Sequence, residues 1–72
     1  MKPIRVWLAV DMDGQALLFR ERPKYDERSG EWHPLSPYGG YFSIDTLPEF
    51  QGQCLEVDVV LQKREHEKES FR

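Results

Sequence analysis

Cysteine is nearly absent from this chain, since Cys54 is the only one in 72 residues. A single thiol cannot form a disulfide within the chain, and disulfides are one usual means of stabilising so short a domain. A structural metal is another, but Cys54, His33 and His66 lack any zinc-type spacing, so we expect no metal and no cofactor. The remaining sources of stability are one well-made core or association with another subunit.

Long apolar runs are also missing. No segment approaches the roughly 20 residues of a membrane-spanning helix, and the first residues lack the apolar stretch and cleavage site of a signal peptide. We therefore expect a cytoplasmic protein with no membrane partner. The charge balance, 10 basic against 13 acidic residues with a net charge of −3, makes nucleic acid an unfavourable partner, because such binding depends on a basic surface.

The sequence does contain the alternation of apolar and polar residues that is typical of strands. Residues 4–10 and 16–20 predict two strands, and the Asp-Met-Asp-Gly segment at 11–14 predicts a hairpin turn between them. Asp at the front of a turn can accept hydrogen bonds from backbone amides, and Gly at its end tolerates positive φ. The first 20 residues are therefore expected to be antiparallel.

The register of this hairpin has two alternatives, which exchange the faces of the strands. One places Val6 opposite Phe19 and Leu8 opposite Leu17, which gives one well-filled face. The other places Trp7 opposite Phe19. We expect the first.

Turn signals and strand signals continue beyond the hairpin. The polar segment at 27–30 ends in glycine and predicts a second turn. Residues 34–40 contain two prolines and two glycines and are expected to be irregular. Residues 41–45 predict a short strand with Phe42 and Ile44 directed into the core.

The last third of the chain completes the predicted fold. Strict alternation over 54–61 predicts the last strand, and Thr-Leu-Pro-Glu predicts one short helix near 46–51, capped by Thr46. The fold class is mainly β, an antiparallel meander of four or five strands with this one helix. Residues 1–62 should form the domain and 63–72 a charged tail. The open edge of the last strand would permit a homodimer.

The Asp-Met-Asp-Gly segment also resembles a catalytic motif. The stretch from Leu8 to Gln15 is similar to the first motif of haloacid-dehalogenase-like phosphatases, an apolar strand followed by Asp-x-Asp-Gly-Thr. The resemblance implies that Asp11 is a nucleophile and Asp13 a general acid, with Mg²⁺ offsetting the charge. However, Gln15 replaces the threonine, no later acidic pair follows an apolar strand, and the chain is too short for a parallel sheet with crossover helices. We therefore favour the turn and predict that the protein is not an enzyme.

Aromatic residues around the irregular segment are the better candidates for a binding site. Trp32, Tyr38 and Tyr41 lie in or beside it, and His33 follows Trp32. Large rings in such a place either cover the second face of a thin sheet or are displayed as interface anchors. We take these four residues as candidate binding residues and leave both alternatives open.

A second resemblance extends over most of the chain. The residues that carry it are mostly turn and core positions: Trp7, Asp11 to Gly14, Leu17, Phe19, Pro23, Gly30 to Trp32, Leu47 to Phe50, and Glu56-Val57. In this pattern the chain resembles small uncharacterised proteins of gut bacteria and their mobile elements or phages. The resemblance implies a compact β-rich module to which no activity is attached.

These observations lead to one leading functional hypothesis and two alternatives. The leading hypothesis is a non-catalytic protein-binding module, either an inhibitor or an adaptor of mobile-element origin. The first alternative is a metal-dependent phosphohydrolase that uses Asp11 and Asp13. The second is nucleic-acid binding through the basic residues around the second hairpin, which are Arg20, Arg22, Lys24 and Arg28.

Overall fold

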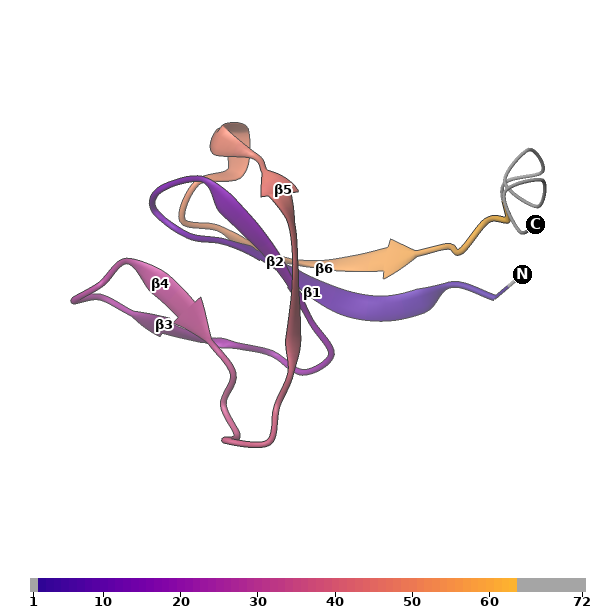
Figure 1. Cartoon of the computed structure of the whole chain (residues 1–72), viewed down its shortest axis with the longest axis horizontal. Helices are drawn as coiled ribbons and strands as arrows, with labels where there is room; N and C mark the ends of the chain where they lie inside the picture. The colour runs from indigo at the N-terminus through magenta and orange to yellow at the C-terminus, as the bar shows by residue number, and fades with distance from the viewer. Residues whose placement is uncertain (1, 64–72) are drawn as a thin grey trace, which may run out of the picture.

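The computed structural model describes residues 2–63, and most of the predicted charged tail at 63–72 lies outside the described residues. The described part is mainly β, which confirms the predicted class (Figure 1). Its elements in chain order are β1 (Ile4–Val10), β2 (Gln15–Phe19), β3 (Lys24–Asp26), β4 (Glu31–His33), β5 (Tyr41–Thr46), the 3₁₀ helix η1 (Pro48–Phe50) and β6 (Cys54–Val59). Within this part no helix is long and apolar enough to cross a membrane.

Four strands form one antiparallel sheet in the order β5-β2-β1-β6, and β3 and β4 form a separate hairpin. The order differs from the predicted meander of four or five strands, because the described residues form six strands, β5 pairs with β2, and β6 pairs with β1 at the opposite edge. Pro23 stands just before β3 and has no amide hydrogen to donate to a ladder, so the chain leaves the sheet there. In Figure 1 the β3–β4 hairpin accordingly lies to one side of the sheet, and β5 crosses β6 steeply.

The register of the first hairpin is the alternative we did not expect. Trp7 lies opposite Phe19. The reason is the length of the turn: the Gly14 amide donates to the Asp11 carbonyl at 2.9 Å, and the Asp11 amide donates to the Gln15 carbonyl at 2.9 Å. Gly14 has φ of 91°, so the loop is a type I turn followed by a left-handed glycine, a common hairpin connection. The extra loop residue shifts the pairing by one and exchanges the faces.

The shifted register gives the sheet two different faces. We call the side that the second hairpin packs on the covered face. Its core consists of the buried residues Ala9, Leu17 and Phe19, with Trp7, Trp32 and Cys54 packed against them. We call the other side the open face. By register its residues are Ile4, Val6, Leu8, Val10, Ala16, Leu18, Phe42, Leu55, Val57 and Val59.

The inward orientation predicted for Phe42 and Ile44 is wrong. Phe42 is 67% exposed and Ile44 is 42% exposed. Phe42 lies opposite Leu18 on the open face of an edge strand whose residues are all exposed. Ile44 is the extra residue of a β-bulge, at which the Gln15 side chain donates to Ser43 Oγ at 2.6 Å and to the Asp45 carbonyl at 3.2 Å.

The predicted helix is present but shorter, and Thr46 does not cap it. Thr46 ends β5, and Leu47 stands at the N-cap position without a side-chain hydrogen bond. The segment is held to the first hairpin instead. The Leu47 amide donates to the Gly14 carbonyl at 2.8 Å, and the Gly52 amide donates to the Val10 carbonyl at 2.9 Å. It therefore closes the turn end of the sheet, where Val10 and Ala16 are fully buried.

Candidate functional site

Trp32, the first candidate binding residue, packs inward. It lies on β4 against the core of the covered face, and its side chain is half-buried. The indole Nε1 donates to the Val10 carbonyl at 3.1 Å. The Tyr25 ring lies beside it, with centroids 4.9 Å apart. Trp32 thus covers the second face of the sheet and is not displayed as an interface anchor.

Asp11 anchors this cover to the first turn. Only 8% of the residue is exposed, and its Oδ1 accepts a hydrogen bond from the Trp32 amide at 2.8 Å. The Met12 amide donates to the Gly30 carbonyl at 2.8 Å. Two long-range hydrogen bonds, one accepted by the Asp11 side chain and one between backbone groups, therefore join the turn at 11–14 to the β3–β4 hairpin.

The electrostatic surroundings of Asp11 work against its ionised form. Burial raises the pKa of this carboxyl above its ordinary value, and the hydrogen bond from the Trp32 amide opposes the rise. The nearby carboxylates of Asp13 and Glu31 raise it further, whereas His33 lowers it. Asp11 is a partly desolvated acceptor whose main contact is structural.

Asp13 has a structural contact of its own. Its Oδ1 accepts a hydrogen bond from the Gln15 amide at 2.9 Å. This bond to the amide two residues later is that of an Asx-turn. The strands on either side of these two carboxylates are antiparallel, whereas the phosphatase resemblance implies a parallel sheet. Within residues 2–63 no group of His, Cys, Asp and Glu side chains is arranged to hold a metal ion.

A groove of about 330 Å³ lies between the second hairpin and the β2–β5 edge of the sheet. It brings together three of the four candidate residues, Trp32, His33 and Tyr41. The rest of its lining is mostly polar: Asp11, Asp13, Gln15, Leu17, Glu31 and Ser43. His33 Nε2 lies 3.5 Å from Glu31 Oε1 and 3.9 Å from Asp26 Oδ2 at the exposed rim. The groove can offer hydrogen bonds and a negative surface to a polar ligand.

The groove does not contain the thiol. Cys54 lies on β6 beside Ala9, and burial raises the pKa of its thiol, with Arg22 opposing the rise. Since the thiolate is the reactive form, this environment disfavours the form of Cys54 that reacts. The Ser43 hydroxyl in the groove contacts the Gln15 amide nitrogen rather than a base.

The fourth candidate residue, Tyr38, lies elsewhere, on a segment that we call the display loop (residues 34–40). Ser36-Pro37-Tyr38-Gly39 has the residues of a type I turn. The Gly39 amide donates to the Ser36 carbonyl at 2.9 Å, and the Tyr38 amide donates to Ser36 Oγ at 3.1 Å. A side chain at Gly39 would meet Pro34 Cβ at 3.0 Å, so the tight loop also needs a glycine there.

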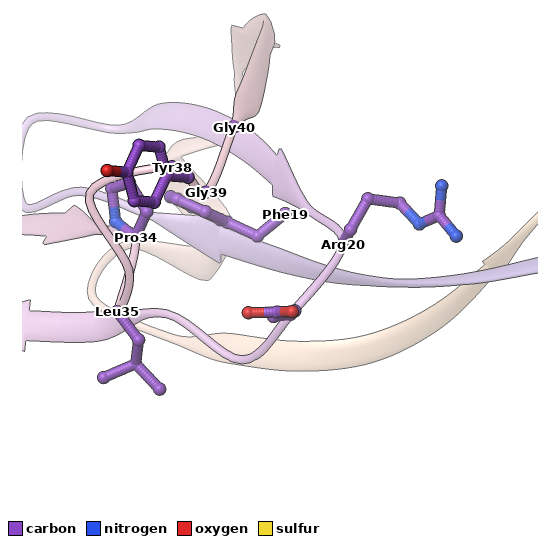
Figure 2. Close-up of a pocket in the computed structure, with 8 residues that line it drawn as sticks. Phe19, Arg20, Pro34, Leu35, Tyr38, Gly39 and Gly40 are labelled. Carbon is purple, nitrogen blue, oxygen red and sulfur yellow. The ribbon is translucent and has the colours of Figure 1, made fainter.

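The display loop presents apolar surface to solvent. Tyr38 is 95% exposed and Leu35 is 64% exposed. They border a hollow of about 200 Å³ that also includes Phe19, Arg20 and Pro34. Figure 2 shows the Tyr38 ring and the Leu35 side chain extending from different sides of the loop. Sequence reasoning missed Leu35, although an apolar residue between two prolines, outside any strand pattern, is a usable signal.

The four basic residues of the nucleic-acid alternative have different surroundings. The Arg22 guanidinium lies over the Trp7 ring, 5.3 Å from its centroid. Arg20 borders the hollow beside the display loop. Lys24 and Arg28 line a groove together with the acidic residues Asp26 and Glu27. In this arrangement each basic residue is near a ring, an apolar surface or an opposite charge.

Comparisons of the chain with protein-family models, with curated proteins and with solved structures find no match.

Proposed function

We propose that this chain is a non-catalytic protein-binding module and that the display loop is its contact surface. The observation that carries the proposal is Tyr38, a large amphipathic ring that is 95% exposed on a hydrogen-bonded turn. Exposed tyrosines of this kind are frequent interface anchors, because they bring contact area and a hydroxyl at low cost in conformational entropy.

The surroundings of Tyr38 support the same proposal. Pro37 fixes one backbone dihedral of the turn, and the contacts of Ser36 restrict the residues that follow. Leu35 adds exposed apolar surface nearby, and the adjacent hollow of about 200 Å³ can accept one side chain of a partner. A partner would therefore meet a surface that is largely ordered before binding.

The biological setting of this proposal comes from the sequence resemblance. An inhibitor or adaptor of mobile-element origin would act in the cytoplasm by occupying a surface of a host protein. The roles of the candidate residues then differ: Tyr38 contacts the partner, Tyr41 and His33 lie at the border of the separate polar groove, and Trp32 holds the fold.

A quantitative pull-down with the tagged full chain tests the proposal. Wild type, Tyr38→Ala and Val60→Ala are compared in host lysate by mass spectrometry, and any captured protein is then purified and titrated directly. Val60 is the matched control, because it is apolar and 59% exposed but lies outside the loop. We expect Tyr38→Ala to lose the partner with unchanged thermal stability and Val60→Ala to retain it. Equal capture by all three proteins would refute the proposal.

A further inference from the structure

The open face of the sheet is apolar and is only partly covered by the described part of the chain. Near η1, Val10 and Ala16 are fully buried, and toward the other end Val6 is 7% exposed. Toward the opposite end, Leu8 and Leu18 stay partly exposed although they lie on the two central strands, and Phe42 is 67% exposed. The second hairpin packs on the other side, so residues 2–63 supply no second layer here.

The size of this surface limits the strength of an interface. Four strands about 4.8 Å apart, with β1 seven residues long, give the whole face a projected area of roughly 450 Å², and Val6, Val10 and Ala16 on it are already buried. A standard interface takes about 800 Å² from each partner, so an interface made by this face alone is of the small, weakly associating class.

Charge at the ends of the open face indicates what covers it. The face carries one charged residue at each end of the β2–β5 pair. Arg20 lies beyond Leu18 and borders a hollow of about 300 Å³ with Val6, Leu18 and Phe42. Asp45 lies opposite Ala16, at the other end of the pair. A two-fold axis that lies between the two faces and runs across the strands stacks a second copy on the first. This rotation brings each Arg20 over the other copy's Asp45.

We infer that the open face docks on the same face of a second copy, which gives a two-layer β-sandwich dimer. The axis passes near Leu18 and Phe42, so the two Phe42 rings lie close to each other across the interface and act as its aromatic anchors. Sheets pack face to face in this way at about 10 Å, with their inner side chains interdigitated. The inference is independent of the display loop and goes beyond the proposed function.

The alternative dimer that the sequence suggested, through the edge of β6, is disfavoured by charge. The fullest antiparallel pairings of β6 with itself place Glu56 opposite Glu56 or opposite Asp58 of the second copy. Like charges directly opposite each other destabilise a ladder. Arg5 already lies near both carboxylates, at 3.6 and 3.9 Å.

Sedimentation and light scattering of the full chain, from about 1 to about 500 μM, test the dimer. We expect a concentration-dependent dimer in wild type and a dimer weakened at least about 100-fold in Phe42→Asp. Phe42 is exposed in the single chain, so this substitution leaves the fold intact, which circular dichroism checks. Tyr38→Asp is the matched control and should dimerise normally. A monomeric wild type, or a dimer indifferent to Phe42→Asp, would overturn the inference.

A charge exchange tests the direction of packing. Arg20→Asp and Asp45→Arg should each weaken the dimer, because each places like charges over one another. The double variant restores opposite charges in exchanged positions and should recover most of the wild-type affinity. A double variant no tighter than the single ones would exclude the two-fold arrangement with Arg20 over Asp45. Tyr38→Ala should lose the lysate partner without affecting the dimer, so the two proposals fail separately.

Discussion

Replacing Asp11 distinguishes a turn residue from a catalytic one. Asp11→Ala removes the acceptor for the Trp32 amide, whereas Asp11→Asn keeps an oxygen at the same position and removes only the charge. If the carboxylate is there to hold the second hairpin, the two variants must differ in stability. If it is kept for its charge, they must behave alike.

The magnitude follows from the contacts of the carboxylate. A hydrogen bond to a charged acceptor contributes about 1.5–3 kcal/mol, and its loss leaves the partly buried Trp32 amide unpaired. We therefore expect Asp11→Ala to lower the free energy of unfolding by about 2–3 kcal/mol. Asp11→Asn weakens the bond but relieves the burial of a charge and its repulsion by Asp13 and Glu31. Its stability should lie within about 1 kcal/mol of wild type.

The pH dependence has a definite sign. The pKa of Asp11 is raised in the folded state above its ordinary value of 3.8, so the native protein holds this proton more tightly than the unfolded chain. The pH-dependent part of the contribution of Asp11 to stability is then fully present below 3.8 and is lost as the pH rises through the raised folded pKa. The stability of Asp11→Asn relative to wild type should increase over the same range.

Urea unfolding followed by tryptophan fluorescence measures these differences, since Trp32 reports on the second hairpin and Trp7 on the sheet. Midpoints for wild type and both variants should be collected at neutral and acid pH with equal m-values. An Asp11→Ala variant as stable as wild type would refute the anchoring role. Equal destabilisation by both substitutions would show that the charge, and not the hydrogen bond, matters.

Three further perturbations follow from the structure. Trp32→Ala should lower the free energy of unfolding by about 2–4 kcal/mol and Trp32→Phe by about 1 kcal/mol, because only the first removes the ring from the core. Urea denaturation measures both values, and equal destabilisation by the two substitutions would contradict this prediction. Gly30→Ala should cost at least about 1–2 kcal/mol, since φ is 73° and the new Cβ would lie 3.0 Å from Met12; an unchanged melting temperature would count against it. Cys54 should react with iodoacetamide at about pH 8 more slowly in the native than in the urea-unfolded protein, because burial raises its thiol pKa; equal rates would disprove this.

Local chemistry in the sequence predicted the elements well. Apolar alternation located β1, β2 and β6, and the glycines at the ends of the two polar segments located both hairpin turns. These signals depend on neighbouring residues only, so one sequence is sufficient to read them. The display loop was likewise predicted as irregular, and its type I turn can be read from Ser36 to Gly39.

Pairing and burial could not be predicted in the same way. The register of the first hairpin depended on whether Gly14 adopts a left-handed conformation after a type I turn, and one residue of loop exchanged the faces. Phe42 has the residue type of a core position, but β5 became an edge strand on the open face. Which strand lies at an edge is decided by long-range pairing, and the alternation pattern contains no information on it.

The same limit explains why the aromatic candidates divided into different roles. Trp32 and Tyr38 lie six positions apart near one irregular segment, so composition alone treats them alike. Trp32 lies on a strand that faces the core, and its indole finds an acceptor in Val10, whose carbonyl is near the first turn. Tyr38 lies at the third position of a turn that directs its ring into solvent. An aromatic residue beside a thin sheet becomes part of the cover when its backbone directs the ring toward the core and its polar atom finds a hydrogen-bond partner there. When the backbone directs the ring outward and the polar atom has no such partner, the ring stays available for another protein.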